Sequence, residues 1–342
     1  MIKQQIINDI LLKMQEEITR EQLKTLEKVL LTVFYTVEVV KMETGLSTDF
    51  DDNAYMIDTI RINMRKRDLS EKTIAQYMRT VQNFLDVIHK NLKNIEPTDV
   101  EYYLNEYAKG RNGKPNSPTT INNQRAFLSG IFAWLRRCNF ITKNPVENIA
   151  KKKSPKKPID FLKGTEVEIL RAACDGETLK GRRERAVMEF FLSTGARVGE
   201  VPDVKIEDID FQTGTLLLYG HKDREYREVY INDAARVHIK RYLDMRKDNS
   251  PYLFVSIRGE VEPIKECALR NVMRGIRDKS ELTRRIYPHL MRKTLASRLR
   301  QQGEPLEDIS EILGHADIRV TQEYYAAQNT QQLKIIHNRS IA

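Results

Sequence analysis

Apolar residues recur at helical spacing through the first part of the chain. No proline occurs between residues 1 and 45, and the first glycine is Gly45. Apolar positions three or four apart mark one helix face, and Thr19 with Gln22 forms the pattern of a capping box for a second helix. We therefore expect a helical hairpin within residues 1–50, whose role is either packing or contact with another subunit. Its apolar positions are Ile2, Ile6, Ile10, Met14, Ile18, Leu23, Leu26, Leu30 and Val33.

Residues 55–150 contain three further amphipathic segments, each with helix start or stop signals. In residues 69–88 the apolar positions form one stripe, which is typical of a helix packed on a core. The pattern predicts a compact helical domain. Its signals are Ser70 as an N-cap, Thr98 with Glu101 as a capping box, Gly110 as a stop, and Ser117 followed by Pro118 as a start.

The pattern becomes mixed after residues 151–160, a lysine- and proline-rich stretch with the composition of a semi-extended linker. Helical segments there alternate with short apolar runs that read as strands. We expect the fold to be mainly α with a small antiparallel β-sheet, with a second, mixed domain over residues 161–330 and a tail over 331–342. The expected strands are 214–220, 226–231 and 252–256, and the expected helices are 164–175, 181–193 and 233–247.

Charge is concentrated in the middle of the chain. Residues 61–160 carry 20 basic and 9 acidic side chains, more than the whole net charge of +9. A basic block in a folded region favours a polyanion partner, because each neutralised phosphate releases condensed counterions. A solvated lysine-rich face is the alternative that charge alone leaves open.

Composition narrows the class of protein. The three cysteines, Cys138, Cys174 and Cys267, form no CxxC pair, which argues against a disulfide framework or a zinc site. The start of the chain lacks the regions of a signal peptide, and its most apolar stretch is too short to span a bilayer. We expect a soluble, cytoplasmic protein that does not bind a membrane.

Three short motifs carry candidate chemistry. Arg197 lies in a glycine-flanked turn, His289 and Arg292 are spaced to share a helix face, and His315 follows a glycine nine residues before Tyr324. Each motif alone is weak. Together they suit a phosphodiester, because arginine forks match phosphate oxygens and a tyrosine hydroxyl becomes a usable nucleophile beside a base.

The ordered set resembles the tyrosine recombinases, the phage integrase family, over roughly residues 55–335. The stretches that carry the resemblance are "TGARVGE", "PHLMRKTLASRL" and "LGHADIRVTQEYY". The resemblance implies a site-specific recombinase without cofactor or metal, which forms a tetramer on two DNA duplexes and works with or without accessory DNA-bending proteins. It also implies location at the nucleoid in the cytoplasm.

The resemblance also implies a role for each motif residue. Tyr324 attacks the scissile phosphate and forms a 3′-phosphotyrosyl bond. Arg197 and Arg292 hold the phosphate oxygens, His289 takes the proton of the nucleophile, and His315 donates a hydrogen bond to the phosphate. Lys222 in the turn between the two central strands falls in the place of the general acid, with Arg224 as the neighbouring candidate.

Two departures from the family pattern stand out. Lys293 occupies a position where a second histidine is common, and Pro202 interrupts the helix expected after Arg197. The N-terminal 50 residues do not resemble the arm-binding domain of some phage integrases, which leaves binding to accessory arm sites without support.

The basic block supplies candidate DNA contacts, although each of them also has a core or surface interpretation. They are Lys72, Tyr77, Arg79, Arg125, Lys151, Lys152 and Lys153. Two alternatives remain to recombination: a type IB topoisomerase, which shares the phosphotyrosyl chemistry, and a DNA-binding regulator without catalysis. The tail over 331–342 resembles the family segment that packs on a neighbouring protomer, and a frayed terminus is its alternative.

Overall fold

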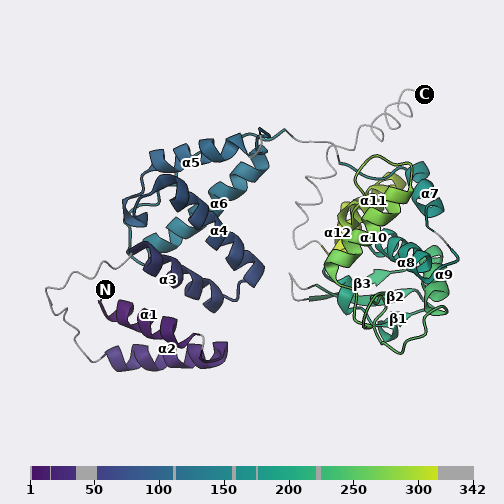
Figure 1. The fold of residues 1–342 in the computed structure, drawn as a ribbon, viewed down its shortest axis with the longest axis horizontal. Coiled ribbons are helices and arrows are strands. Elements are labelled where there is room, and N and C mark those ends of the chain that lie inside the picture. Colours follow the sequence, from purple (N-terminus) through teal and green to yellow (C-terminus); the bar gives the residue numbers. More distant parts are fainter. Residues whose placement is uncertain are drawn as a thin grey trace. The chain divides into compact units, whose positions relative to one another are not determined.

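The computed structural model describes residues 2–15, 17–35, 52–110, 113–155, 159–174, 176–220 and 225–314. The chain divides into two compact units, residues 1–156 and 157–342 (Figure 1). Helices dominate both, and the second also holds a small antiparallel sheet. The predicted fold class is confirmed.

The first unit is helical throughout its described part. Its elements are α1 (Ile2–Met14), α2 (Arg20–Tyr35), α3 (Asp52–Lys66), α4 (Glu71–Ile88), the 3-10 turn η1 (Leu92–Asn94), α5 (Pro97–Lys109) and α6 (Pro118–Arg137). Phe84, Leu128 and Phe132 are fully buried among α3 to α6. Edge-to-face packing of Phe84 on Tyr103 and Phe132 adds to this core.

Helix starts in this unit follow the sequence signals with one exception. The Ser70 hydroxyl accepts a hydrogen bond from Thr73 N at 3.2 Å, as an N-cap does. Ser117 does the same for α6. The capping box predicted at Thr98 and Glu101 is wrong. Helix α5 begins earlier because Pro97 takes the first helical position, so Glu96 and Asp99 form the box instead.

The N-terminal hairpin α1–α2 forms its own apolar cluster and packs on α3. Gln22 Oε1 accepts from Thr19 N at 2.9 Å, so the predicted capping box is confirmed. In α2 the apolar face turns to Phe34, and Val33 is exposed, contrary to the expected stripe.

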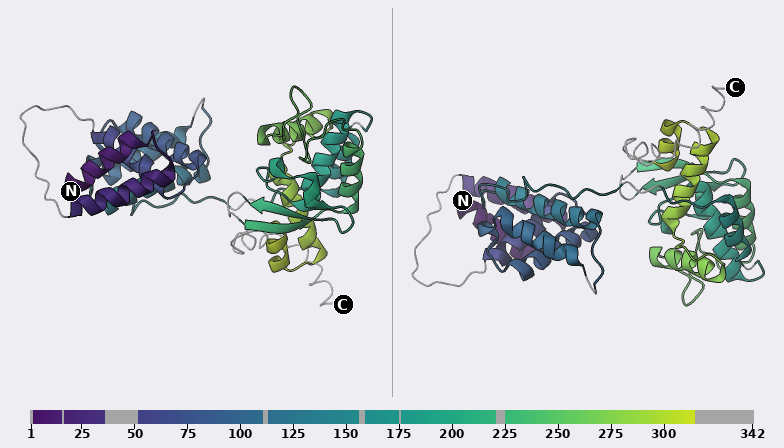
Figure 2. Two further views of the ribbon diagram at one scale, coloured as in Figure 1. Left: turned by 90° about the horizontal axis from the view of Figure 1, so that it is seen from below. Right: turned by 90° about the horizontal axis from the view of Figure 1, so that it is seen from above.

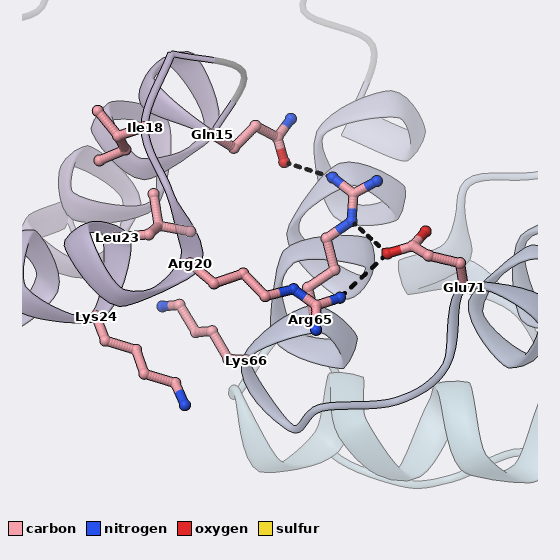
Figure 3. A pocket seen from close by; sticks show the side chains of 8 residues that line it. All are labelled: Gln15, Ile18, Arg20, Leu23, Lys24, Arg65, Lys66 and Glu71. Atoms are coloured by element: carbon pink, nitrogen blue, oxygen red, sulfur yellow. Dashed lines mark hydrogen bonds and ion pairs between the residues drawn. The ribbon is translucent and has the colours of Figure 1, made fainter. Parts of the chain in front are cut away.

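Charged side chains join this hairpin to α3 and the start of α4 around a pocket (Figure 3). Lys66 pairs with Glu27 at 2.6 Å, and Arg20 pairs with Glu71 at 3.2 Å. Arg65 reaches the same Glu71 carboxylate at 3.3 Å. The hairpin's apolar cluster is separate from the main core of the unit, and these pairs add to the contacts of α1 with α3.

The lysine stretch after α6 is held against that helix over its described part. Asn122 exchanges two hydrogen bonds of 2.9 Å with the backbone of Lys152. Arg125 Nε donates to Ile149 O at 2.6 Å. Lys151, Lys152 and Lys153 are all exposed, so the attachment presents their side chains to solvent.

The second unit surrounds a helix that is buried over most of its length. This helix, α8 (Leu179–Thr194), contacts α9, α10 and α11. Phe190 and Phe191 on it are fully buried. The other elements are α7 (Gly164–Ala172), η2 (Val201–Asp203), η3 (Ile206–Asp208), β1 (Ile209–Asp210), β2 (Thr215–Gly220), β3 (Glu225–Tyr230), α9 (Asp233–Leu243), α10 (Glu266–Lys279), α11 (Pro288–Gln302) and α12 (Leu306–Leu313).

Strands β2 and β3 form an antiparallel hairpin at the edge of this unit (Figure 2), and β1 pairs with the other side of β2. In this register Leu216 lies opposite Val229, and Leu218 lies opposite Arg227. The strand predicted at 252–256 is wrong. Leu253, Phe254 and Val255 are buried in the helical core, and the segment makes only isolated bridges with Lys205 and Pro263.

Pro202 acts as expected on the segment after Arg197. The chain enters the 3-10 turn η2 with Pro202 in its first turn, and no α-helix follows until α9 within the described residues. In the same part of the chain, no helix is long and apolar enough to cross a membrane.

Candidate functional site

Helix α11 carries two of the predicted site residues in its first two turns. Pro288 starts the helix and Gly303 ends it with left-handed geometry, as the sequence signals predict. His289 is exposed as a residue, whereas Arg292, one turn later, is only 3% exposed. A buried guanidinium requires several hydrogen-bond acceptors, because an unpaired charge in the interior is very costly.

The ends of two helices supply those acceptors. Arg292 Nη1 donates to Gly195 O at 2.8 Å, and its Nη2 donates to Leu313 O. Gly195 and Gly314 cap α8 and α12 in the left-handed conformation, with φ of 60° and 62°. The last carbonyls of a helix lack partners within it and carry partial negative charge. Arg292 therefore joins the C-terminal ends of α8 and α12.

Arg197 reaches the same place from the turn after α8. Its Nη2 donates to Gly314 O at 2.5 Å, the carbonyl that follows the one bound by Arg292. Arg197 and Arg292 are far apart in sequence, yet both guanidinium groups lie at the end of α12. The arrangement concentrates two fixed cations beside Gly314, the residue that precedes His315 in the sequence.

A buried carboxylate that the motif analysis missed holds Arg197. Glu200 is 3% exposed, and it accepts from Arg197 N at 2.7 Å and from Arg197 Nη1 at 3.1 Å. Its other partner is Arg227 on β3, with contacts of 2.5 and 2.7 Å. Burial alone would raise the pKa of Glu200, but the hydrogen bonds and charges of Arg227 and Arg197 lower it. Glu200 is therefore held as a carboxylate.

A sequence signal for Arg227 exists in the alternation of β3. Val229 on this strand is buried, so Arg227, two residues earlier, faces the same side. An arginine at an inward strand position requires a buried acid partner. The acid three residues after Arg197 satisfies that requirement, although only the fold brings the two together.

The imidazole of His289 lies in positive surroundings. Protein atoms around the ring lower its pKa by burial, and the charges of Lys293, Arg292 and Arg197 lower it further. The neutral ring, which accepts a proton, is thereby favoured at neutral pH. Of the six predicted catalytic residues, the structure brings Arg197, His289 and Arg292 together. Lys222, His315 and Tyr324, along with the candidate Arg224, lie outside the described residues.

The predicted DNA contacts divide by their surroundings. Tyr77 packs edge-to-face on Phe127 at 4.8 Å and against Gly130, and it lies partly buried against the core of the first unit. Lys72 and Arg79 are both exposed on α4. They are seven positions apart, so they lie on the same face of the helix. The remaining candidates lie where the lysine stretch meets α6, and they are Arg125, Lys151, Lys152 and Lys153.

Comparisons with known proteins agree with this arrangement. The chain matches the model of the Phage integrase family over residues 160–331, half of its 342 residues. Residues 56–139 match the phage integrase N-terminal SAM-like domain. Tyrosine recombinase XerC of Bacillus subtilis (strain 168) is 29% identical over 272 residues, which cover 76% of this chain and 87% of the relative. A tyrosine recombinase of Thermosipho africanus is 28% identical over 256 residues, covering 75% and 88%.

Solved structures share the fold at lower identity. The Tn1549 transposon integrase in complex with transposon right end DNA gives a TM-score of 0.66 at 18% identity, covering 84% of this chain and 99% of that one. A lambda integrase dimer bound to a COC′ core site gives 0.64 at 21% identity, covering 79% and 94%. A lambda integrase tetramer bound to a Holliday junction gives 0.62 at 20% identity, covering 87% and 88%.

Proposed function

This chain belongs to the phage integrase family, and we propose on that premise that it is a site-specific DNA recombinase. The observation that carries the proposal is the meeting of Arg197 and Arg292 at the end of α12, with His289 beside them. Two fixed guanidinium groups suit the two non-bridging oxygens of one phosphodiester. Such a pair stabilises the negative charge that develops when a nucleophile attacks the phosphorus.

In the proposed reaction the Tyr324 hydroxyl attacks the scissile phosphorus. Its proton passes to neutral His289, the bond from phosphorus to the 5′ oxygen breaks, and Lys222 or its neighbour Arg224 protonates the leaving oxygen. His315 donates a hydrogen bond to the phosphate. A 3′-phosphotyrosyl bond and a free 5′-hydroxyl result. The arginines supply the charge stabilisation that metal ions give in many nucleases, so we propose a metal-independent reaction.

For the assembly we propose a homotetramer on two DNA duplexes, as in the lambda integrase complex with a Holliday junction. Paired strand exchange requires two active sites on each duplex, and the phosphotyrosyl bond conserves the energy of the phosphodiester. The exposed basic residues of the first unit would contact the DNA backbone. We further propose that the protein works in the cytoplasm, where the chromosome lies.

The test is covalent capture on a library of nicked duplexes with random sequence, carried out in EDTA. Adducts that survive denaturation are recovered and sequenced, which also identifies the preferred site. We expect adducts with wild type and with Tyr325→Phe, and none with Tyr324→Phe. The 5′-labelled strand should remain on the protein, and the released strand should carry a 5′-hydroxyl that a kinase labels directly.

Adduct formation by Tyr324→Phe would refute the assignment of the nucleophile, and a strict need for metal would refute the mechanism. Two outcomes favour the alternatives. Relaxation of supercoiled DNA that lacks every selected sequence would indicate a type IB topoisomerase. Sequence-specific binding with no adduct on any duplex would indicate a regulator without catalysis.

A further inference from the structure

One carboxylate serves two arginines in the second unit. Each carboxylate oxygen of Glu200 accepts one hydrogen bond from each arginine. Oε1 accepts from Arg197 Nη1 at 3.1 Å and from Arg227 Nη1 at 2.5 Å. Oε2 accepts from Arg197 N at 2.7 Å and from Arg227 Nη2 at 2.7 Å. The Glu200 side chain is 2% exposed and that of Arg227 is 11% exposed. Water therefore does little to screen these charges, and their balance affects all three groups.

The balance of charge indicates that Arg227 neutralises Glu200. Two guanidinium groups and one carboxylate leave one positive charge over. With Arg227 present, Glu200 is neutralised from the β3 side, and the charge of Arg197 remains for a phosphate. Without Arg227, Arg197 would be the remaining cationic partner of this buried carboxylate among the described residues, and the two would neutralise each other.

Arg227 also packs against Gly314, whose carbonyl is the second partner of Arg197. A side-chain carbon at Gly314 would overlap Arg227 Cδ, and Arg227 Nε would lie 3.0 Å from it. The Gly314 carbonyl accepts from Arg197 Nη2 at 2.5 Å. One side chain on β3 thus touches both groups that fix the Arg197 guanidinium, the Glu200 carboxylate and the turn at Gly314.

We propose that Arg227 is a positioning residue for DNA cleavage, which neutralises Glu200 and so keeps the charge and direction of Arg197 for the scissile phosphate. This inference rests on the proposed recombinase function. It concerns a residue that does not touch the substrate, and its effect passes through Arg197. The decrease in cleavage rate when Arg227 is replaced should therefore depend on the charge of the phosphate.

The experiment measures single-turnover adduct formation on two versions of a captured site. One has the ordinary phosphodiester, and the other has a methylphosphonate at the scissile position, which removes one negative charge. On the phosphodiester, Arg227→Met should lower the rate by about 100-fold, the scale of a displaced positioning group. On the methylphosphonate, its rate should approach that of wild type, because a neutral linkage needs the second cation less. Arg227→Lys, which keeps the charge, should recover part of the loss.

A second variant separates charge balance from simple packing. In Arg227→Met/Glu200→Gln the carboxylate is neutral, so Arg197 is no longer neutralised. We expect the double variant to cleave the phosphodiester faster than Arg227→Met alone. A packing role predicts the reverse, because two changes would disturb the interior more than one.

The chain offers a matched control in another buried carboxylate shared by two arginines. Glu189, 1% exposed, accepts from Arg171 twice at 2.8 Å and from Arg185 at 2.8 Å. Arg171→Met removes the same kind of pair without touching Glu200. It should slow cleavage equally on both linkages, if at all.

The outcomes distinguish the two proposals. If wild type forms no adduct on either linkage, the recombinase function fails and this inference fails with it. If wild type cleaves but Arg227→Met shows the same relative rate on both linkages, as Arg171→Met does, only the role of Arg227 is refuted. A double variant slower than Arg227→Met would refute it as well.

Discussion

At the scale of single residues, positive charge surrounds His289. Burial of part of the ring and the neighbouring cations Lys293, Arg292 and Arg197 all lower its pKa. A base that must be neutral to accept a proton therefore stays active below the pH at which a free histidine becomes charged. Lys293, a departure from the common family pattern, contributes directly to this property.

The resulting prediction concerns the acid limb of the pH–rate profile for adduct formation. In wild type it should lie below pH 6.5, the ordinary histidine value. Lys293→Gln removes a cation that lowers the His289 pKa, so the limb should move to higher pH. Single-turnover rates and NMR titration of the His289 ring both measure the shift. Lys247→Gln, at an exposed lysine of the same unit, should leave it unchanged, and a downward shift in Lys293→Gln would contradict the electrostatic explanation.

Residue-scale inference from sequence succeeded where spacing alone sufficed. The three-residue spacing of His289 and Arg292 predicts a shared helix face, and both lie on α11. Glu200 and Arg227 were missed because their pairing spans 27 positions and depends on which strand face turns inward. The roles given to Lys222, His315 and Tyr324 stay predictions, since these residues lie outside the described part of the chain.

At the scale of elements, the N-terminal hairpin depends on charge for its attachment. The Lys66–Glu27 pair joins it to α3, and its side chains are 19% and 26% exposed. Ion pairs at this depth contribute up to about 1 kcal/mol each and weaken in salt. We therefore expect the hairpin to open separately from the core of its unit.

Charge reversal tests this attachment. Lys66→Glu places two carboxylates together and should raise hydrogen-exchange rates in α1 and α2 by about fivefold or more. The swap Lys66→Glu/Glu27→Lys should restore protection. Reversal of Lys109, which pairs with Glu106 inside α5, is the control and should leave α1 and α2 unaffected. Unchanged exchange in Lys66→Glu would show that apolar contacts alone hold the hairpin.

Element prediction from the pattern failed where tertiary packing decides the local structure. Residues 252–256 have the composition of a strand, but Leu253 and Phe254 lie in the helical core, and the segment forms isolated bridges and belongs to none of the strands among the described residues. The two-residue strand β1 is too short to leave a period in the sequence. Both cases reflect the dependence of strand formation on available partners.

At the scale of the whole molecule, the lysine stretch at the end of the basic block is fixed to α6. Three exposed lysines, Lys151 to Lys153, follow Ile149, whose carbonyl binds Arg125. Because the backbone of Lys152 is held by Asn122, the chain that carries these charges is ordered before DNA arrives. That order lowers the entropy lost on binding.

Salt dependence of DNA binding measures their contribution. If each lysine neutralises one phosphate, Lys151→Gln/Lys152→Gln/Lys153→Gln should reduce the slope of log affinity against log salt by up to about 2.7. Fluorescence anisotropy with a duplex of arbitrary sequence suffices. The control removes the same charge from Lys3, Lys13 and Lys28 of the acidic N-terminal segment and should change the slope little. Equal changes in both triple variants would mean that only net charge matters.

The seating of Arg197 and Arg292 on helix ends has a consequence for the protein before it meets DNA. Most of the loss of water around Arg292 takes place during folding, when its guanidinium settles on the carbonyls of Gly195 and Leu313. A phosphate that arrives later meets a buried Arg292 and a partly exposed Arg197 that are both fixed in direction, so little reorganisation remains for the reaction itself. The free protein is in this sense already partly organised for the transition state, because the C-terminal ends of α8 and α12 hold both arginines in place.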